Sequence, residues 1–270
     1  MLFACQPFLT PEGSGSFKLV LATTTSTYDS GLLDFLLPDF EAKYNAKVEV
    51  IAVGTGQAIT LGERGDVDVI LVHARAREDE FVAKGYGLNR QDVMYNDFVV
   101  IGPVADPAGI KGLADVVAAF RRMAEVKAAF ISRGDESGTH VKEREIWRKA
   151  GIEPEGDWYV LAGQGMGAVL TMAQERQAYT LTDRGTYLTR NSTGLELAVL
   201  VEGDPILFNP YGVIAVNPEK YPAVRYDLAQ KFMAWLTSLE TQKRIAQFGR
   251  EEFGQQLFIP DSEEWRAANQ

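Results

Sequence analysis

Short apolar segments alternate with helix-prone segments along most of this chain. The first apolar segment covers residues 17–22, and later ones include residues 47–53 and 68–72. Each has the length of a buried strand, and each is followed by a stretch whose apolar residues recur at helical spacing. This alternation predicts an α/β protein with a parallel sheet that helices cover on both faces.

The turns after these strands are rich in glycine and hydroxyl side chains. Five consecutive hydroxyl residues, 23–27, separate the first strand from its helix, although one or two would be enough to cap a helix. Residues 54–57 follow the second strand, and His73 follows the third. Ligands of doubly wound folds bind at the carboxyl ends of the strands, so we expect these turns to lie together at a binding edge.

A further turn of this kind, residues 132–140, follows the apolar segment 128–131 and precedes a helix-prone stretch. Its glycines allow backbone N–H groups to point toward one centre, its hydroxyl groups add donors, and Arg133 adds a charged fork of donors. These residues predict a cradle for a small oxyanion. The alternative is a capped helix start, with Ser137 as the N-cap and Arg133 paired to a nearby carboxylate.

At 270 residues the chain is long enough for two lobes with separate cores. We interpret Pro103, which ends an apolar run, as the crossover into a second lobe, and residues 206–216 as the return to the first. The predicted divisions are a tether at 1–16, a first lobe at 17–102 and 205–270, and a second lobe at 103–204.

The N-terminal residues suggest export. Residues 1–5 resemble the end of a secretory signal, with Ala4 before a cysteine that could carry a lipid, and residues 6–16 form a tether rich in Pro, Gly and Ser. The alternative is a disordered N-terminus of a trimmed chain. Cys5 is the only cysteine, so the chain has no intramolecular disulfide, and we expect a monomer.

The net charge of −10 and the lack of a Lys/Arg cluster argue against a nucleic-acid partner. An acidic protein can still bind an anion, because charges beyond about 10 Å are largely screened at 0.1 M salt. No apolar run is long enough to cross a membrane.

The sequence also lacks the motifs of several enzyme classes. The two histidines, His73 and His140, have no second His or Cys at metal-ligand spacing, and Cys5 lies in the tether, away from any catalytic base. Residues 54–56 lack the lysine of a P-loop, and residues 163–167 depart from dinucleotide spacing. We therefore expect no metal site, no cofactor and no catalysis: the distinctive residues suit holding an anion more than transforming it.

Taken together, these motifs resemble those of the periplasmic tungstate-binding proteins of bacterial tungstate ABC importers. The Arg-x-Asp-x-Ser-Gly-Thr core alone also resembles the anion loop of phosphate-binding proteins. The segments that carry the resemblance are residues 23–26, 53–57, 70–74, 132–135, 137–140 and 182–187.

The resemblance implies a two-lobed periplasmic-binding-protein-like fold of type II, with mixed sheets flanked by helices and two crossover segments. It implies that tungstate or molybdate is clamped between the lobes and passed to the membrane permease of an ABC importer. It also supports a periplasmic location, or a lipid anchor at Cys5 on the extracytoplasmic side.

The resemblance also implies a set of ligand residues. Asp183 and Arg184 match the family pattern as well, and their role as contact or hinge stays open. The residues carried over as ligands are Thr24, Thr25, Ser26, Thr55 and Gly56 from the first lobe and Arg133, Ser137, Gly138, Thr139 and Gly167 from the second.

The residues leave some alternatives open. Phosphate near neutral pH usually carries a proton and needs an acceptor, whereas tungstate, molybdate and sulfate need only donors. Asp135 would supply that acceptor or would orient Arg133, and the donor-rich first lobe favours the second role. Other candidate functions are a phosphate- or sulfate-binding protein, an enzyme that holds a phosphorylated small molecule, and a ligand-sensing domain of a transcription regulator. The lack of a helix-turn-helix segment before the first strand argues against the regulator.

Overall fold

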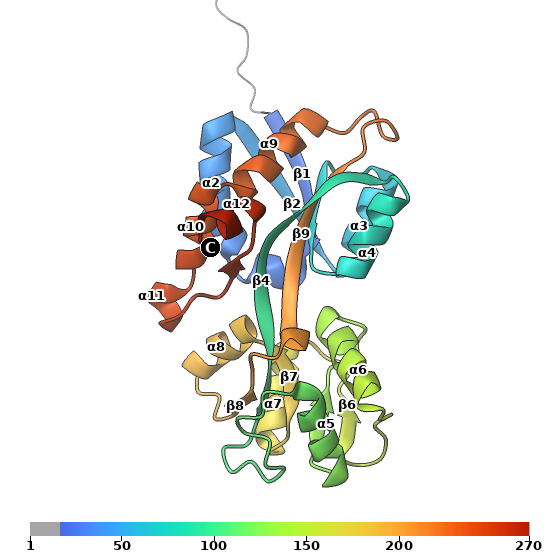
Figure 1. The fold of residues 1–270 in the computed structure, drawn as a ribbon, viewed down its shortest axis with the longest axis vertical. Helices are drawn as coiled ribbons and strands as arrows, with labels where there is room; N and C mark the ends of the chain where they lie inside the picture. Colours follow the sequence, from blue (N-terminus) through green and yellow to red (C-terminus); the bar gives the residue numbers. More distant parts are fainter. Residues whose placement is uncertain (1–16, 270) are drawn as a thin grey trace, which may run out of the picture.

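The structure is a computed structural model that describes residues 17–269, which form two lobes joined by two long strands (Figure 1). The predicted signal remnant, tether and lipidation site at Cys5 lie outside the described residues. The joining strands are β4 (Gly87–Gly102) and β9 (Phe208–Val216), which pair with each other in antiparallel fashion.

The sheet of the first lobe is mixed, with the strand order β10-β4-β9-β3-β1-β2. Its remaining strands are β1 (Phe17–Thr24), β2 (Ala46–Val53), β3 (Val69–Val72) and β10 (Ile259–Pro260). β1 is parallel to β2 and β3, whereas β9 is antiparallel to β3 and β4 is antiparallel to β9 and β10. The wholly parallel sheet that the alternation predicts is therefore wrong beyond β1–β3, because β4 and β9 enter the sheet as strands that pass between the lobes.

Helices cover both faces of this sheet. The alternating side chains of β3 show it: Val69 and Leu71 pack with α2 and α9, whereas Ile70 and Val72 pack with α3 and α4. The helices of the lobe are α1 (Thr25–Asp29), α2 (Leu32–Tyr44), α3 (Thr55–Arg64), α4 (Arg75–Ala83), α9 (Tyr226–Thr237), α10 (Leu239–Gln247), α11 (Arg250–Phe253) and α12 (Glu263–Ala268).

The second lobe is built around the far end of β4, which pairs with β7 (Thr180–Asp183) and β8 (Ala198–Val201). A parallel pair, β5 (Phe130–Ser132) and β6 (Tyr159–Leu161), joins it through a bridge between Phe130 and Tyr179. The helices are α5 (Val116–Glu125), α6 (Gly138–Ala150), α7 (Met166–Glu175) and α8 (Arg184–Ser192), and the 3-10 helix η1 (Pro205–Leu207) precedes β9.

The outward crossing lies within β4. Up to Asp97 this strand pairs with β9 and β10, and from Phe98 it pairs with β7 and β8. The pairing thus changes before the predicted lobe limit at 102/103, because β4 continues through the crossing to Gly102 and Pro103 only follows the end of the strand.

None of the helices in residues 17–269 is both long enough and apolar enough to span a membrane.

Candidate anion-binding site

The carboxyl ends of β1 and β2 bring two helix starts together at one edge of the first lobe. Thr24 pairs in register with Val53, so α1 and α3 begin side by side. Thr25 and Ser26 are exposed at the start of α1, and Thr55 and Gly56 are partly exposed at the start of α3. The first backbone N–H groups of a helix have no partner within the helix, so this edge offers donors to an anion.

Part of the hydroxyl run is used within the fold. The Thr23 hydroxyl donates to the carbonyl oxygen of Leu71 at 2.8 Å. The Thr24 side chain is buried and caps α1, since its Oγ1 accepts the Thr27 N–H at 3.3 Å and lies 2.6 Å from Thr27 Oγ1. The residues that we predicted as a turn therefore include a short helix, and Thr24 acts as its N-cap.

The second-lobe loop contains both the cap and the charged group that the sequence indicates. Ser137 is the N-cap of α6, and its Oγ accepts the His140 N–H at 3.3 Å. Arg133 is hydrogen-bonded to Asp135 through Nε, at 3.1 Å from Oδ2, and through Nη2. The other carboxylate oxygen of Asp135 accepts the Ser137 N–H at 3.2 Å.

The charge on Asp135 follows from these contacts. Partial burial on its own would raise the pKa of this carboxyl group, but the hydrogen bonds from Ser137 and Arg133 outweigh it and hold the pKa below its usual range. Asp135 is therefore ionised at neutral pH, with both oxygens engaged. This supports its role in orienting Arg133 rather than accepting a proton from a ligand.

His73 connects the two lobes. It follows β3 in the first lobe, and a Cβ atom placed on Gly138, the first residue of α6, would lie 3.1 Å from His73 Cε1. His73 Nδ1 lies 2.9 Å from Asn209 Oδ1, and the ring centroid lies 4.8 Å from that of Tyr211. The start of α6 thus lies directly against the end of β3.

Tyr211 extends this connection to the hydroxyl run. Burial raises the pKa of its hydroxyl group, and the side chains of Thr27 and Asn96 lie close enough to oppose that shift. Contacts therefore lead from Thr24 through Thr27, Tyr211 and His73 to Gly138. The two predicted groups of donors lie at opposite ends of this short path.

Asp183 and Arg184 stabilise the crossing. The carboxylate of Asp183 caps α8 by accepting the Thr186 N–H at 2.8 Å. Arg184 pairs with both oxygens of Asp97, at 2.8 and 2.5 Å, and with Glu202 at 2.6 Å. Asp97 is the last residue of β4 before its pairing changes, so the Arg184 side chain is engaged by carboxylates at the crossing between the lobes.

Gly56 and Gly167 differ in their surroundings. A Cβ atom on Gly56 would lie 2.9 Å from Nη1 of Arg77, an exposed residue of α4, whereas one on Gly167 would have no neighbour within 4 Å. Arg77 has no ion-pair partner among residues 17–269. The sequence gives no sign of Arg77 as a site residue. It places His73 at the binding edge but does not indicate its contact with Gly138, because a contact between distant segments leaves no periodic signal.

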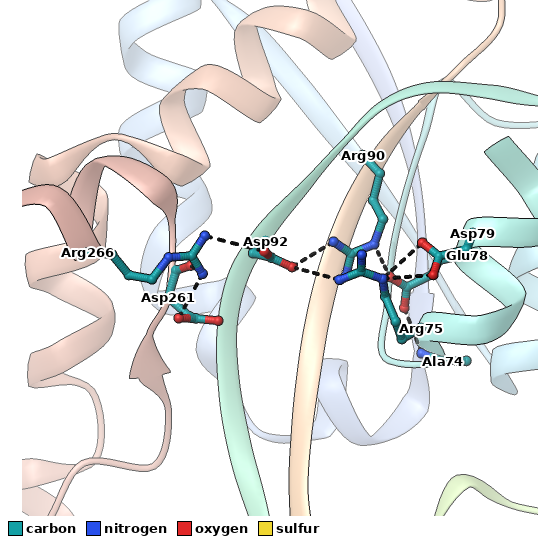
Figure 2. A network of polar contacts seen from close by, with 8 residues as sticks. All are labelled: Ala74, Arg75, Glu78, Asp79, Arg90, Asp92, Asp261 and Arg266. Atoms are coloured by element: carbon teal, nitrogen blue, oxygen red, sulfur yellow. Dashed lines mark hydrogen bonds and ion pairs between the residues drawn. The ribbon is translucent and has the colours of Figure 1, made fainter. Parts of the chain in front are cut away.

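A polar network fixes the turn that carries His73 (Figure 2). The Ala74 N–H donates to Glu78 Oε1 at 2.6 Å, and Glu78 Oε2 accepts from Arg90 Nε at 2.7 Å. Arg90 in turn bonds to Asp92 at 2.6 Å, and Asp92 pairs with Arg266 near the C-terminus. The buried Glu78 therefore holds the end of the β3 turn against β4.

Two surface pockets lie away from these donors. One is lined by α2, α9 and α10 residues, including Lys43 and Arg244, and the other by residues that include Arg144 and Trp147. Neither contains a predicted ligand residue. Within residues 17–269, no three His, Cys, Asp or Glu side chains gather in a way that would hold a metal ion.

Similarity to known proteins identifies the superfamily of this chain and then its family. A family model described as "PBP superfamily domain" matches residues 10–240, so the chain belongs to the PBP superfamily. The tungstate-binding protein TupA of Peptoclostridium acidaminophilum is 50% identical over 268 residues, which cover 97% of this chain and 93% of that protein. Within the superfamily, the chain belongs to the family of these TupA proteins.

Solved structures agree with this assignment. The tungstate-binding protein TupA from Desulfovibrio alaskensis matches with a TM-score of 0.85 and 48% identity, over 92% of this chain and all of that chain. The structure titled as the tungstate ABC transporter from Geobacter sulfurreducens matches with a TM-score of 0.76 and 58% identity, over 86% of this chain and 98% of that chain. The predicted type II fold and the predicted family are confirmed.

Proposed function

We propose that this chain is an extracytoplasmic solute-binding protein that captures a tetrahedral oxyanion between its lobes. Tungstate is the proposed ligand, with molybdate as a second one. The observation that carries the proposal is the contact between Gly138 and His73, because it brings the start of α6 and the Arg133 loop to the edge where α1 and α3 begin. The names of the relatives support tungstate as the ligand.

The donors at this edge suit a dianion that loses its water on binding. Each hydrogen bond to a charged group contributes about 1.5–3 kcal/mol net. Six to eight such bonds would contribute about 9–24 kcal/mol. The upper part of this range exceeds the roughly 12 kcal/mol of a nanomolar complex, and that surplus would offset lobe closure and the lost freedom of the ligand. Arg133 and the exposed N-termini of α1 and α3 supply donors of this kind.

Selection against phosphate follows from the same donors. The hydrogen phosphate ion brings a proton that needs an acceptor, and both oxygens of Asp135 are already engaged by Arg133 and Ser137. We therefore expect phosphate to compete poorly with tungstate. Sulfate, like tungstate, needs only donors, so this argument applies to phosphate alone.

We propose that the bound anion is delivered to the membrane permease of an ABC importer. The protein would act as a monomer, in the periplasm or anchored on the outer side of the membrane through Cys5. It would catalyse no reaction and need no cofactor. The relatives are named as binding proteins, which supports this proposal over an enzyme that holds a phosphorylated molecule.

Isothermal titration calorimetry with tungstate, molybdate, sulfate and phosphate tests the proposal. We expect tight tungstate binding, and at least a tenfold loss of affinity in Arg133→Ala, because the substitution removes a full positive charge with its donors. Arg176→Ala, which removes an exposed arginine of the same lobe, is the matched control and should bind like the wild type. Equal affinities of Arg133→Ala and wild type would remove Arg133 from the site.

A further inference from the structure

Glu143 is a buried carboxyl group on the same helix that presents the second-lobe donors. Its residue is 1% exposed, and it lies on α6 four residues after Thr139 and five after Gly138. Among residues 17–269 no lysine, arginine or histidine forms an ion pair with it. The anion site as described above makes no use of this group.

Glu143 ties together three elements beneath the anion loop. Its Oε1 accepts from the Tyr159 hydroxyl of β6 at 2.7 Å and from Trp147 Nε1 of α6 at 3.2 Å. Ser132, the last residue of β5 and the one before Arg133, is fully buried, and its hydroxyl lies close enough to affect the titration of Glu143. The carboxyl group is thus in the layer that supports Arg133.

Burial raises the pKa of Glu143 to about 7, although the hydrogen bonds from Tyr159 and Trp147 and the nearby Ser132 hydroxyl group oppose this shift. The titratable groups near Glu143 lie on α6, on β6 and in the loop before α6. Burial raises the pKa of Tyr159, so its hydroxyl stays neutral. Arg144 is paired with Glu136, and His140, one turn before Glu143, accepts the Glu136 N–H through Nδ1.

We propose that Glu143 couples anion affinity to pH, by taking up a proton when a dianion binds at the start of α6. The proposal rests on the proposed function. At a rise of 1.5 Å per residue, the backbone of Glu143 lies about 7.5 Å along the helix axis from that of Gly138, which is within the roughly 8 Å screening length of physiological salt. A neutral Glu143 does not oppose a dianion, whereas an ionised one repels it through the protein interior.

The direction of the effect follows from linkage. Well below pH 7 Glu143 is protonated in both the free and the bound protein, so affinity is at its maximum. As the pH rises through about 7, Glu143 in the free protein loses this proton. Binding of the anion then requires Glu143 to take up a proton again or places the anion near a negative charge, and either one weakens binding. Tungstate is fully ionised throughout. We expect binding about tenfold weaker at pH 9 than at pH 6.5, which corresponds to about 1.4 kcal/mol.

Titration calorimetry of the full chain with sodium tungstate tests this between pH 6.5 and 9, with two buffers of different ionisation enthalpy at pH 8. The wild type should take up protons on binding, and Glu143→Gln should abolish both the uptake and the pH dependence. Glu145→Gln is the control and should keep both, because it removes another carboxylate of α6, one that is paired with Lys142, and leaves Glu143 in place.

A second variant keeps the test open if Glu143→Gln does not fold. Tyr159→Phe removes a hydrogen bond that lowers the pKa of Glu143, so the midpoint of the affinity profile should move to higher pH. A wild-type affinity that does not change with pH, or proton uptake that persists in Glu143→Gln, would overturn the inference. Failure of the wild type to bind tungstate even at pH 6.5 would instead refute the proposed function.

Discussion

Substitution of Gly138 by alanine should weaken anion binding without weakening the fold. Gly138 is the first residue of α6 and does not have a positive φ, so its backbone accepts a side chain. Alanine is a better helix former than glycine, by up to about 1 kcal/mol within a helix. With the lobes together, however, the new Cβ would lie 3.1 Å from His73 Cε1, inside the roughly 3.5–4.0 Å of an ordinary carbon contact.

The size of the loss of affinity depends on how far the His73 ring can move away from the new Cβ atom. Its ring is hydrogen-bonded to Asn209 and packs against the tilted ring of Tyr211, so it has little room to move. Overpacking of this kind typically costs about 1–3 kcal/mol. If the cost arises only when the lobes close on the anion, it corresponds to a loss of affinity of about 5- to 150-fold.

Calorimetry with tungstate and thermal unfolding of the ligand-free protein measure the two effects separately. Gly138→Ala should bind more weakly while its unfolding temperature stays the same or rises. In a His73→Ala background the same substitution should cost little, because the obstructing ring is gone. Wild-type affinity in Gly138→Ala, or an equal loss in both backgrounds, would refute the inference that closure presses His73 against α6.

Two further substitutions test the charges around the site. Arg77→Gln should weaken binding of tungstate more than that of perrhenate, a tetrahedral ion with a single negative charge, because the removed guanidinium lies next to Gly56. Equal losses of affinity for the two ions in calorimetry would exclude Arg77 from charge recognition. Arg184→Met should lower the free energy of unfolding in urea by about 2 kcal/mol, since it leaves the partly buried Asp97 without its cation. This loss of stability should be smaller in an Asp97→Asn background. An unchanged urea midpoint would show that the crossing does not need this ion pair.

Strands β1, β2 and β3 and the start of α6 could be predicted because their signals are local. The apolar alternation marks β1, β2 and β3, and the Ser137 cap marks the start of α6. The helix α1 was missed because consecutive Thr and Ser residues favour turns and caps, and a five-residue helix owes its stability to packing rather than to propensity.

The crossing and the inter-lobe contacts could not be predicted in the same way. We interpret residues 93–102 of the sequence as a single strand. Asn96 and Asp97 interrupt its apolar residues just before the partners of the strand change, but two polar residues within a strand do not by themselves indicate a change of lobe. The contact between His73 and Gly138 joins residues that are far apart in sequence. The contact between Arg77 and Gly56 also joins two separate segments, although they are closer in sequence. Motif resemblance named Gly56 and Gly138, but only the three-dimensional structure supplies their neighbours.

The account depends on one anion being held by both lobes at once. Crystals grown with tungstate, measured at the tungsten absorption edge, would locate the metal directly by its anomalous scattering. We expect a single strong peak within hydrogen-bond reach of the Arg133 side chain, the start of α6 and the starts of α1 and α3. A peak that contacts only one lobe, or one in the surface pocket beside Arg144, would contradict it.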